Sequence, residues 1–449
     1  MPRVFLIVPA RESTPFATPH LGCAMLTASL KQHGHDVRVY DYAYLRGEER
    51  SWEAVRRQLE EFRPDVVGVS VCTASVSTAK ELARRAKVLL NAPVVAGGPH
   101  ATLNPDKLIA LEYIDTVVTG DGEMVLPHIA AQPEQFAKKI VAAGQIDVRA
   151  VPPADFSAFH QPERIHVYPL MTSRGCPFNC SFCTVHTVTS RKWRSRELES
   201  VFAELDAAVR QFPKLKRIEI HDDCPTTDVP RFKTFLRELI ARKLPLALTV
   251  ANVRADTVDE ELVDLLIKAG STSICIAAEH GNPDVFDFIG KAEKLEDIER
   301  AARIIKKRGA KLSLCFVIGL PKDNLERIRD SVKLAKRLRP SLIYWNMAHP
   351  FRHTRIREWY EANGGTILDD DDHSSYAEPS LMCDEPIVWT PDFTAEQRKQ
   401  AKFLCVVETD QYRLRTEGLR KLFSMARGYG YTWPAIKSVL RKTFHLSYD

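Results

Sequence analysis

The stretch TSRGCPFNCSFCTVH, residues 172–186, holds three of the ten cysteines of this 449-residue chain. Cys176 is the middle residue of a Gly-Cys-Pro turn that follows a short apolar segment, and Cys180 and Cys183 come shortly after it. A structural zinc site usually takes paired C-x-x-C knuckles, and no second pair follows here. A [4Fe–4S] cluster can be held by three thiolates, which leaves a fourth iron for an outside ligand. The spacing therefore favours the cluster over zinc.

The sequence around the cysteines alternates between strand and helix signals six times, from residue 166 to about residue 360. Apolar strands that alternate with amphipathic helices are typical of parallel α/β folds. The pattern predicts a partial (β/α)6 barrel of the TIM type over 166–360, in which Ser195 caps the first helix. The chemistry of such barrels lies at the carboxyl ends of the strands, and the cysteines follow the first strand.

A second α/β series occupies residues 1–135 and predicts a doubly wound parallel sheet of the Rossmann or flavodoxin type. Two of its strand-end loops, AGGPHAT (96–102) and TGDGE (119–123), contain glycines that let a ligand approach the backbone closely. No G-x-G-x-x-G follows the first strand, so a dinucleotide is not favoured. Residues 136–165, rich in Pro and Ala, predict a linker, and residues 361–449 predict a mainly helical C-terminal region.

The composition is that of a globular protein, with 45% hydrophobic and 27% charged residues. The net charge of +5 is small for this length, and we expect no nucleic-acid partner. No apolar run approaches the roughly 20 residues of a membrane span, so we expect a cytoplasmic protein with reduced thiols. The acidic run at 369–373 predicts a solvated loop. Basic helices near the C-terminus leave open a peripheral contact with an anionic membrane or a lipid-like substrate.

The segment GCPFNCSFC resembles the C-x3-C-x-aromatic-C signature of the radical S-adenosylmethionine enzymes. The resemblance implies a [4Fe–4S] cluster on Cys176, Cys180 and Cys183, with S-adenosylmethionine on its open iron. One electron would then cleave S-adenosylmethionine to a 5′-deoxyadenosyl radical, which abstracts hydrogen from an unactivated carbon. The protein supplies orientation, and the cofactor carries the chemistry. The resemblance also implies a reducing partner such as flavodoxin or ferredoxin.

Residues at the ends of the second and third barrel strands match polar groups of the same family. Asp222 and Asp223, in EIHDDC, would lie near the methionyl amine of S-adenosylmethionine. A helix N-cap is the alternative role for this pair. Arg254, after the third strand, would hold the carboxylate of S-adenosylmethionine.

The later strands continue the resemblance and depart from it in two places. Glu279, in IAAEHGN, matches the acidic residue of the family's Glu-Ser segment, with His280 in place of the serine. It would bond the ribose or the amino group of S-adenosylmethionine. Gly319, in FVIGLP, lies in the segment whose backbone meets the adenine. The loop HPFRHT has Arg352 and His353 where the family usually has Pro-Gly, and this loop faces the substrate.

The segment PFATPHLGCAMLTASLKQHGHDVRVYD, residues 15–41, resembles the opening of the cobalamin-binding domain in B12-dependent radical enzymes. VVAGGPHAT and VVTGDGE resemble that domain's two strand-end loops, with Asp121 in place of a glutamate. The Asp-x-His-x-x-Gly signature of a cobalt-ligating histidine is absent. The resemblance therefore implies cobalamin bound without a histidine ligand from this chain. For His100, a contact on the phosphate side or with the residues that bind cobalamin is preferred over the alternative role of cobalt ligand. The residues implied to contact cobalamin are Gly97, Gly98, His100, Thr102, Gly120 and Glu123.

The expected function is that of a cobalamin-dependent radical methyltransferase. It would act on an unactivated carbon of a small-molecule or lipid-like intermediate, through methylcobalamin and a 5′-deoxyadenosyl radical. The alternative is a radical enzyme of the same family that catalyses cyclisation, ring contraction or carbon–carbon bond formation without methyl transfer. A tRNA methylthiolating enzyme needs three N-terminal cysteines, and only Cys23 and Cys72 precede the triplet. A non-enzymatic cobalamin or iron–sulfur carrier would not need six intact strand–helix units.

Overall fold

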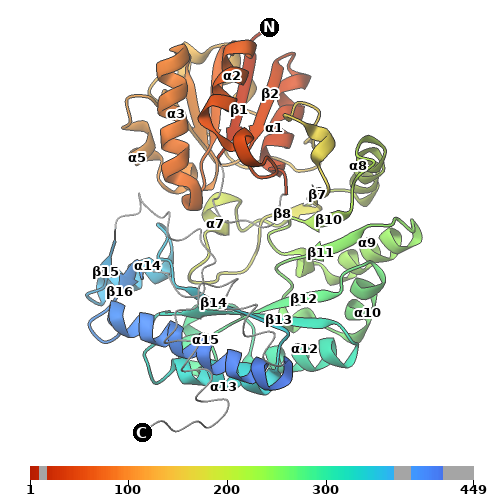
Figure 1. Ribbon diagram of the computed structural model, residues 1–449, viewed down its shortest axis with the longest axis vertical. Helices are drawn as coiled ribbons and strands as arrows, with labels where there is room; N and C mark the ends of the chain where they lie inside the picture. The colour runs from red at the N-terminus through yellow and green to blue at the C-terminus, as the bar shows by residue number, and fades with distance from the viewer. Residues whose placement is uncertain (10–17, 369–385, 418–449) are drawn as a thin grey trace.

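The computed structural model describes residues 1–9, 18–368 and 386–417. An N-terminal α/β domain stands over a barrel-like domain, and the C-terminal helix α15 (Ala395–Glu417) lies against the outside of the barrel (Figure 1). The loop that carries the three cysteines lies between the two domains. This arrangement places the two α/β domains face to face, with the cysteine loop at the boundary between them.

The N-terminal domain is a six-stranded, fully parallel sheet in the order β2-β1-β3-β4-β5-β6. Its first five strands follow the flavodoxin-like order, which confirms the predicted doubly wound domain. The strands are β1 Arg3–Val8, β2 Asp36–Asp41, β3 Val66–Ser70, β4 Val94–Gly97, β5 Thr116–Thr119 and β6 Lys139–Ala142. The helices are α1 Leu21–Gln32, α2 Trp52–Phe62, α3 Val76–Leu90, α4 Pro99–Leu103, α5 Pro105–Ile109 and α6 Leu126–Ala131.

The sheet continues into the segment 136–165, which we expected to be a linker. Strand β6 lies within it and pairs in parallel with β5. At the opposite edge of the sheet, the backbone N–H of Val39 donates to the carbonyl of Ala158 over 2.9 Å. Phe156 and Phe159 are buried in the main core. The boundary at residue 135 is thus too early, because the apolar residues of this segment pack onto the domain.

The second domain contains six parallel strands, each followed by helical structure, as the alternation of strand and helix signals predicts. They form two three-stranded groups, β7-β10-β11 and β12-β13-β14, joined by a parallel bridge between Val253 and Ile276. Strands β7 and β14 are the outer members, so the barrel is open. The strands are β7 Val167–Leu170, β10 Arg217–Ile220, β11 Ala247–Val250, β12 Ser273–Glu279, β13 Lys311–Ile318 and β14 Leu342–Met347.

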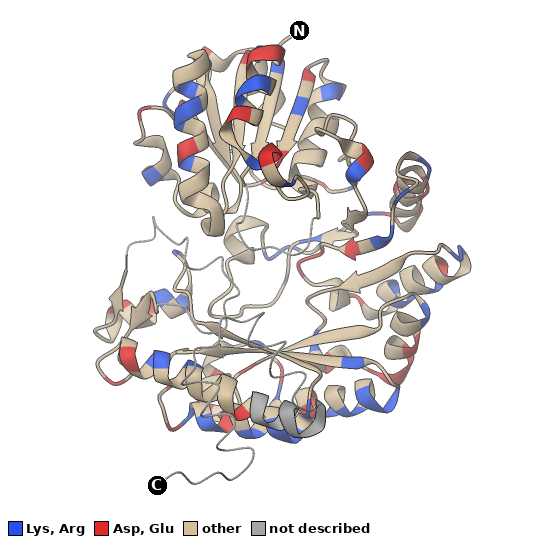
Figure 2. Cartoon of the chain, viewed as in Figure 1, with Lys and Arg blue, Asp and Glu red and all other residues tan. Residues whose placement is uncertain are grey.

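Amphipathic helices cover the outside of this barrel, with their apolar faces on the strands. They are α8 Leu198–Gln211, α9 Val229–Ala241, α10 Glu260–Lys268, α11 Pro283–Ile289, α12 Leu295–Lys307, α13 Ile328–Leu338 and α14 Arg355–Ala362. Figure 2 shows that Lys, Arg, Asp and Glu residues lie mainly on the helices and loops, while the strands are mostly free of them. Short elements complete the domain: β8 Ser173–Arg174, α7 Val185–Val188, β9 Arg194–Ser195, β15 Thr366–Ile367 and β16 Val388–Trp389.

The predicted cap at Ser195 is wrong. Ser195 lies in β9 and pairs antiparallel with Ser173 of β8, while Glu197 is the residue that precedes α8. This pairing holds Ser195 in extended backbone and fastens the segment after the cysteine loop to the segment before it.

Helix α15 lies in the region where we expected a mainly helical C-terminus. The acidic run at 369–373 and the basic segment beyond residue 417 lie outside the described residues. Among the helices that the structure describes, none combines the length and the apolar character needed to cross a membrane.

Candidate active site between the two domains

The three cysteines lie on one loop, between β8 and α7, at the carboxyl end of the first barrel strand. Gly175 opens this loop with φ +89°, and a Cβ at this position would collide with the carbonyl oxygen of Lys192. Its backbone N–H donates to Asp223 Oδ2 over 2.7 Å. The N–H of Cys176 donates to the carbonyl of Ser190 over 3.2 Å. The loop is therefore fixed at its start by backbone contacts that only glycine permits.

The three thiols are partly exposed and affect one another. A hydrogen bond with Cys224 and burial raise the pKa of Cys176. Burial and the charge of Cys183 raise the pKa of Cys180 to about 12. Burial also raises the pKa of Cys183. These raised pKa values mean that the thiolate forms are disfavoured in the absence of a cation. A bound cation would stabilise the thiolates and so lower the pKa values again.

The thiol set fits a cluster. Among the described residues, no three His, Cys, Asp or Glu side chains lie close enough together to hold a single metal ion. A [4Fe–4S] cluster does not require such closeness, because each thiolate binds a different iron. A fourth thiol, the buried Cys224, lies beside Cys176 and hydrogen-bonds to it.

Asp222 and Asp223 face different surroundings, although they are neighbours in the sequence. Asp222 is 2% exposed and accepts hydrogen bonds of 2.6 Å from Thr172 N, Thr172 Oγ1 and Ser173 Oγ. Asp223 lines the cavity between the domains and anchors the cysteine loop. Neither caps a helix, because Asp228 is the N-cap of α9. Asp222 therefore holds the end of β7, and only Asp223 reaches the site.

Glu279 belongs to a buried ionic cluster deeper in the barrel. Lys291 Nζ lies 3.5 Å from Glu279 Oε1 and 3.0 Å from Glu293 Oε2. Arg254 Nη2 lies 2.8 Å from Asp256 Oδ2, and Arg254 Nε lies 3.7 Å from Glu293 Oε1. Two cations thus face three carboxylates, which leaves one negative charge in excess. Burial raises the pKa of Glu279, so a cationic ligand near its carboxylate would be stabilised.

Arg254 already forms hydrogen bonds within the protein, so it has fewer donors for the carboxylate of S-adenosylmethionine that we expected it to hold. Its guanidinium donates to Asp256 and to the carbonyl of Lys291, so three of its five N–H groups are in use. The guanidinium also lies 3.5 Å from the ring centre of Phe178, between the first two cysteines. Arg254 therefore supports the cysteine loop through Phe178, and any bond to a carboxylate would use its remaining donors.

The backbone of Gly319 is fully occupied by protein groups. Its N–H donates to Asp323 Oδ2 over 2.8 Å, and its carbonyl accepts from Tyr360 Oη and Arg398 Nη1. The other carboxylate oxygen of Asp323 lies 3.1 Å from His280 Nε2, and both side chains are fully buried. The expected backbone hydrogen bond to adenine thus cannot come from Gly319 itself. His280 has a structural role, because it contacts the same carboxylate that binds the N–H of Gly319.

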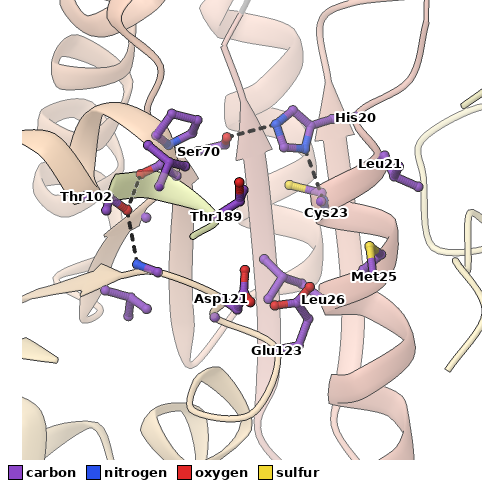
Figure 3. Close-up of a pocket in the computed structure, with 18 of the residues that line it drawn as sticks. His20, Leu21, Cys23, Met25, Leu26, Ser70, Thr102, Asp121, Glu123 and Thr189 are labelled. Atoms are coloured by element: carbon purple, nitrogen blue, oxygen red, sulfur yellow. Dashed lines mark hydrogen bonds between the residues drawn. The ribbon is translucent and has the colours of Figure 1, made fainter. Parts of the chain in front are cut away.

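A cavity of about 390 Å³ separates the N-terminal sheet from the mouth of the barrel (Figure 3). Leu6, Leu26, Val95, Val118 and Leu126 form part of its apolar lining. The barrel contributes the side that faces them, with Met171, Ser173, Arg174, Val188, Thr189, His221 and Asp223. An apolar interior with polar groups at the boundary is the kind of lining that a large amphipathic cofactor such as cobalamin requires.

The glycine loops border this cavity where the sequence predicts. A Cβ at Gly97 would meet no atom closer than 4.0 Å, so any side chain there would occupy open space at the cavity wall. Gly98 and Gly120 have φ values of +103° and +80°. Thr102 Oγ1 accepts from the N–H of Gly120 over 3.1 Å and joins the two loops. These four residues line the cavity, whereas His100 is fully buried outside it.

Glu123 also lines the cavity, but its carboxylate binds the barrel. Arg174 Nη1 lies 2.7 Å from Asp121 Oδ1, and Arg174 Nη2 lies 2.9 Å from Glu123 Oε1. Arg194 Nη1 lies 3.1 Å from Asp121 Oδ2. These side chains are 6–11% exposed. The second glycine loop is therefore tied to the strand that leads directly into the cysteines.

His20 is a cavity residue that sequence reasoning missed. It lies within the segment of residues 15–41 that resembles the opening of a cobalamin-binding domain, and this position was the available signal. Its Nδ1 accepts from the N–H of Cys23 over 3.1 Å, which caps α1. Its Nε2 lies 3.2 Å from Ser70 Oγ, and its backbone N–H donates to Asp41 Oδ2 over 2.7 Å. Because Nδ1 is an acceptor, Nε2 carries the proton of the neutral ring.

Comparisons with known proteins identify a known domain in each of the two α/β regions of the chain. A model of the B12 binding domain matches residues 8–130, and a model of the radical SAM superfamily matches residues 170–335. An uncharacterized methyltransferase of Pyrococcus horikoshii is 27% identical over 389 residues, which cover 80% of this chain and 83% of that protein. The anaerobic magnesium-protoporphyrin IX monomethyl ester cyclase of Cereibacter sphaeroides is 27% identical over 371 residues, 75% of this chain and 60% of the cyclase.

Solved structures also match nearly the whole chain. One of them is the radical S-adenosylmethionine methyltransferase TsrM from Kitasatospora setae, with cobalamin and a [4Fe–4S] cluster bound. The TM-score is 0.71 at 19% sequence identity, and the match covers 99% of each chain. At this identity the likeness establishes a common fold.

Proposed function

Since the chain belongs to the B12-binding radical S-adenosylmethionine enzymes and binds a [4Fe–4S] cluster, S-adenosylmethionine and cobalamin, we propose that it methylates an unactivated carbon. One observation carries the proposal: the cavity that fits cobalamin is lined by Asp223 and Thr189, which also hydrogen-bond each other beside the cysteine loop. A methyl carrier in this cavity would therefore lie next to the cluster. The substrate carbon would lie between them.

The side chains have separate tasks in this proposal. Cys176, Cys180 and Cys183 hold the cluster, and Glu279 offers its carboxylate to the positively charged part of S-adenosylmethionine. Asp223 keeps the loop in place through the N–H of Gly175. When bound, the cluster supplies the electron that cleaves S-adenosylmethionine, and cobalamin carries the methyl group. The apolar cavity lining excludes water from this chemistry.

The test is the set of products formed by anaerobically reconstituted protein. A methyltransferase of this kind consumes S-adenosylmethionine in two ways, so both S-adenosylhomocysteine and 5′-deoxyadenosine should accumulate with a substrate. Formation of 5′-deoxyadenosine without S-adenosylhomocysteine would rule out methyl transfer and leave the radical step intact.

That outcome would favour the alternative, a cyclisation, ring contraction or carbon–carbon bond formation. The similarity to the anaerobic cyclase supports keeping it, although the chain spans only 60% of that protein. Mass spectrometry of the product separates the two, because methylation adds one carbon and three hydrogens in place of one hydrogen.

The remaining features of the proposal rest on the sequence. We propose a small-molecule or lipid-like substrate, a reducing partner such as flavodoxin or ferredoxin, and a cytoplasmic location. A peripheral membrane contact through the basic C-terminal segment remains part of the proposal, and vesicle co-sedimentation of the full chain would test it.

A further inference from the structure

A buried arginine of the C-terminal helix reaches the end of the fifth barrel strand. Arg398, in the first turns of α15, is 2% exposed and is the largest fully buried side chain of the described residues. Burying a guanidinium is costly unless its N–H groups find acceptors. Those of Arg398 donate to the carbonyl of Phe393 over 3.1 Å, to the carbonyl of Gly319 over 3.2 Å and to Tyr360 Oη over 3.3 Å.

The position that Arg398 contacts is shaped for it. Gly319 has φ +83°, and a Cβ on this residue would collide with Arg398 Nη1. The carbonyl of Gly319 also accepts from Tyr360 Oη, so both of its lone pairs are used. The turn after β13 thus has one fixed position relative to α15.

The opposite side of the same turn leads to the residues expected to bind S-adenosylmethionine. Asp323 accepts from the N–H of Gly319 over 2.8 Å and lies 3.1 Å from His280, which follows Glu279 in the chain. Gly319 is therefore held between a buried cation and a buried anion. A continuous set of contacts runs from α15 to the end of β12.

The turn also forms part of the apolar surroundings of the cysteine loop. Val317 and Leu320, on either side of Gly319, belong to one apolar cluster with Cys180 and Phe182. A displacement of this turn would therefore move the apolar wall beside the cluster cysteines.

Helix α15 is itself firmly attached to the barrel. Trp345 Nε1 of β14 donates to Thr409 Oγ1 over 3.3 Å, and Lys336 of α13 pairs with Glu408. These contacts fix the position of α15 on the barrel, and with it the position of the Arg398 guanidinium.

We propose that Arg398 is a positioning residue for S-adenosylmethionine, which it places through the Gly319 turn and the Asp323–His280 pair. The proposal rests on the binding of S-adenosylmethionine and not on methyl transfer. It assigns a role to the C-terminal helix, outside the six strand–helix units that carry the cysteines. Because small displacements of a bound reactant lower reactivity steeply, the effect of its loss should be large.

The test compares Arg398→Met, Arg398→Lys and the control Lys399→Met, which removes a neighbouring exposed cation of the same helix. The full-length protein is reconstituted anaerobically and reduced with dithionite. Iron content and the visible spectrum report the cluster, and electron paramagnetic resonance with and without S-adenosylmethionine reports its binding. The KM and kcat of S-adenosylmethionine cleavage are measured separately from S-adenosylhomocysteine formation.

We expect Arg398→Met to keep its iron, to lose most of the spectral response to S-adenosylmethionine, and to show a KM raised on the order of tenfold. Arg398→Lys should recover part of this loss, because lysine can still donate to the Gly319 carbonyl, and Lys399→Met should match the wild type. If Arg398→Met does not fold, Tyr360→Phe provides the test, since it removes the second donor to that carbonyl. An unchanged KM and spectral response in the folded variants, or a loss of iron together with S-adenosylmethionine binding, would overturn the proposal.

Discussion

Arg174, two residues before the first cluster cysteine, pairs with Asp121 across the boundary between the domains, with 2.7 Å between Nη1 and Oδ1. The pair is nearly buried, and Arg194 shares the same carboxylate. Removing one partner of a buried ion pair leaves an uncompensated charge. The contact therefore links the second glycine loop to the cysteine loop energetically as well as in space.

Replacing this carboxylate should weaken the junction between the domains. We expect Asp121→Asn to lower the free energy of unfolding by about 3 kcal/mol, because two buried guanidinium groups lose their shared anion. Chemical denaturation measures the change. Asp147→Asn removes an exposed carboxylate paired with Arg149 and should have little effect. Equal destabilisation by the two variants would contradict the inference.

Filling the open space at Gly97 should separate cobalamin binding from cluster assembly. A leucine side chain there would project into the cavity, whose nearest atoms lie 4.0 Å from the Cβ position. We expect Gly97→Leu to bind no cobalamin, as followed by its visible spectrum after gel filtration, while iron content stays unchanged. The exposed substitution Ala110→Leu in the same domain is the control. Normal cobalamin retention by Gly97→Leu would place the cofactor elsewhere.

The stability of the protein should depend on pH through Asp41. Burial raises its pKa to about 7, while hydrogen bonds from Ala43 and His20 lower it. The folded state therefore holds this proton more tightly than the unfolded chain, so the contribution to stability is lost as pH rises through 7. We expect unfolding to become easier by about 1 kcal/mol between pH 6 and pH 8. Asp41→Asn should lack this part of the pH dependence, and an identical profile in both proteins would show that Asp41 does not titrate in this range.

The cluster should depend on three cysteines and not on the fourth thiol beside them. We expect Cys176→Ala to lose iron and S-adenosylmethionine cleavage together, because a cluster iron would lack its ligand. Cys224→Ala should keep its iron, since Cys224 lies outside the loop that carries the triplet and only hydrogen-bonds to it. Cys72→Ala, in the other domain, serves as the control. Loss of iron in Cys224→Ala would add a fourth ligand to the site.

The sequence predicts this fold well where local patterns are strong. The twelve parallel strands of the two domains follow apolar runs and helix signals, apart from β6. The spacing of the three cysteines predicts which loop would hold a cluster. Strand β6 was not predicted, because it is a short edge strand whose side chains are mostly exposed and therefore show no pattern of buried apolar residues. Asp222 and Asp223 could not be distinguished, because they follow the last residue of β10, where no strand alternation indicates which of the two faces the cavity.

Contacts between distant parts of the chain were beyond sequence reasoning. Lys291 and Glu293 come close to Glu279 only because two turns of the barrel meet. Arg398 reaches Gly319 across 79 positions of sequence. The ion pairs of Asp121 and Glu123 depend on the docking of two domains, which neither domain's own pattern encodes. In each case the sequence shows that a charged residue is present, but it does not show which residue it pairs with in the folded protein.

The wall of the cavity is built from both domains, so its shape depends on how firmly the two domains are held together. The ion pairs of Asp121 and Glu123 with Arg174 join the two sides of that wall. We expect a cofactor held there to dissociate more slowly while these pairs are intact, because its dissociation rate then reflects domain separation as well as its own contacts.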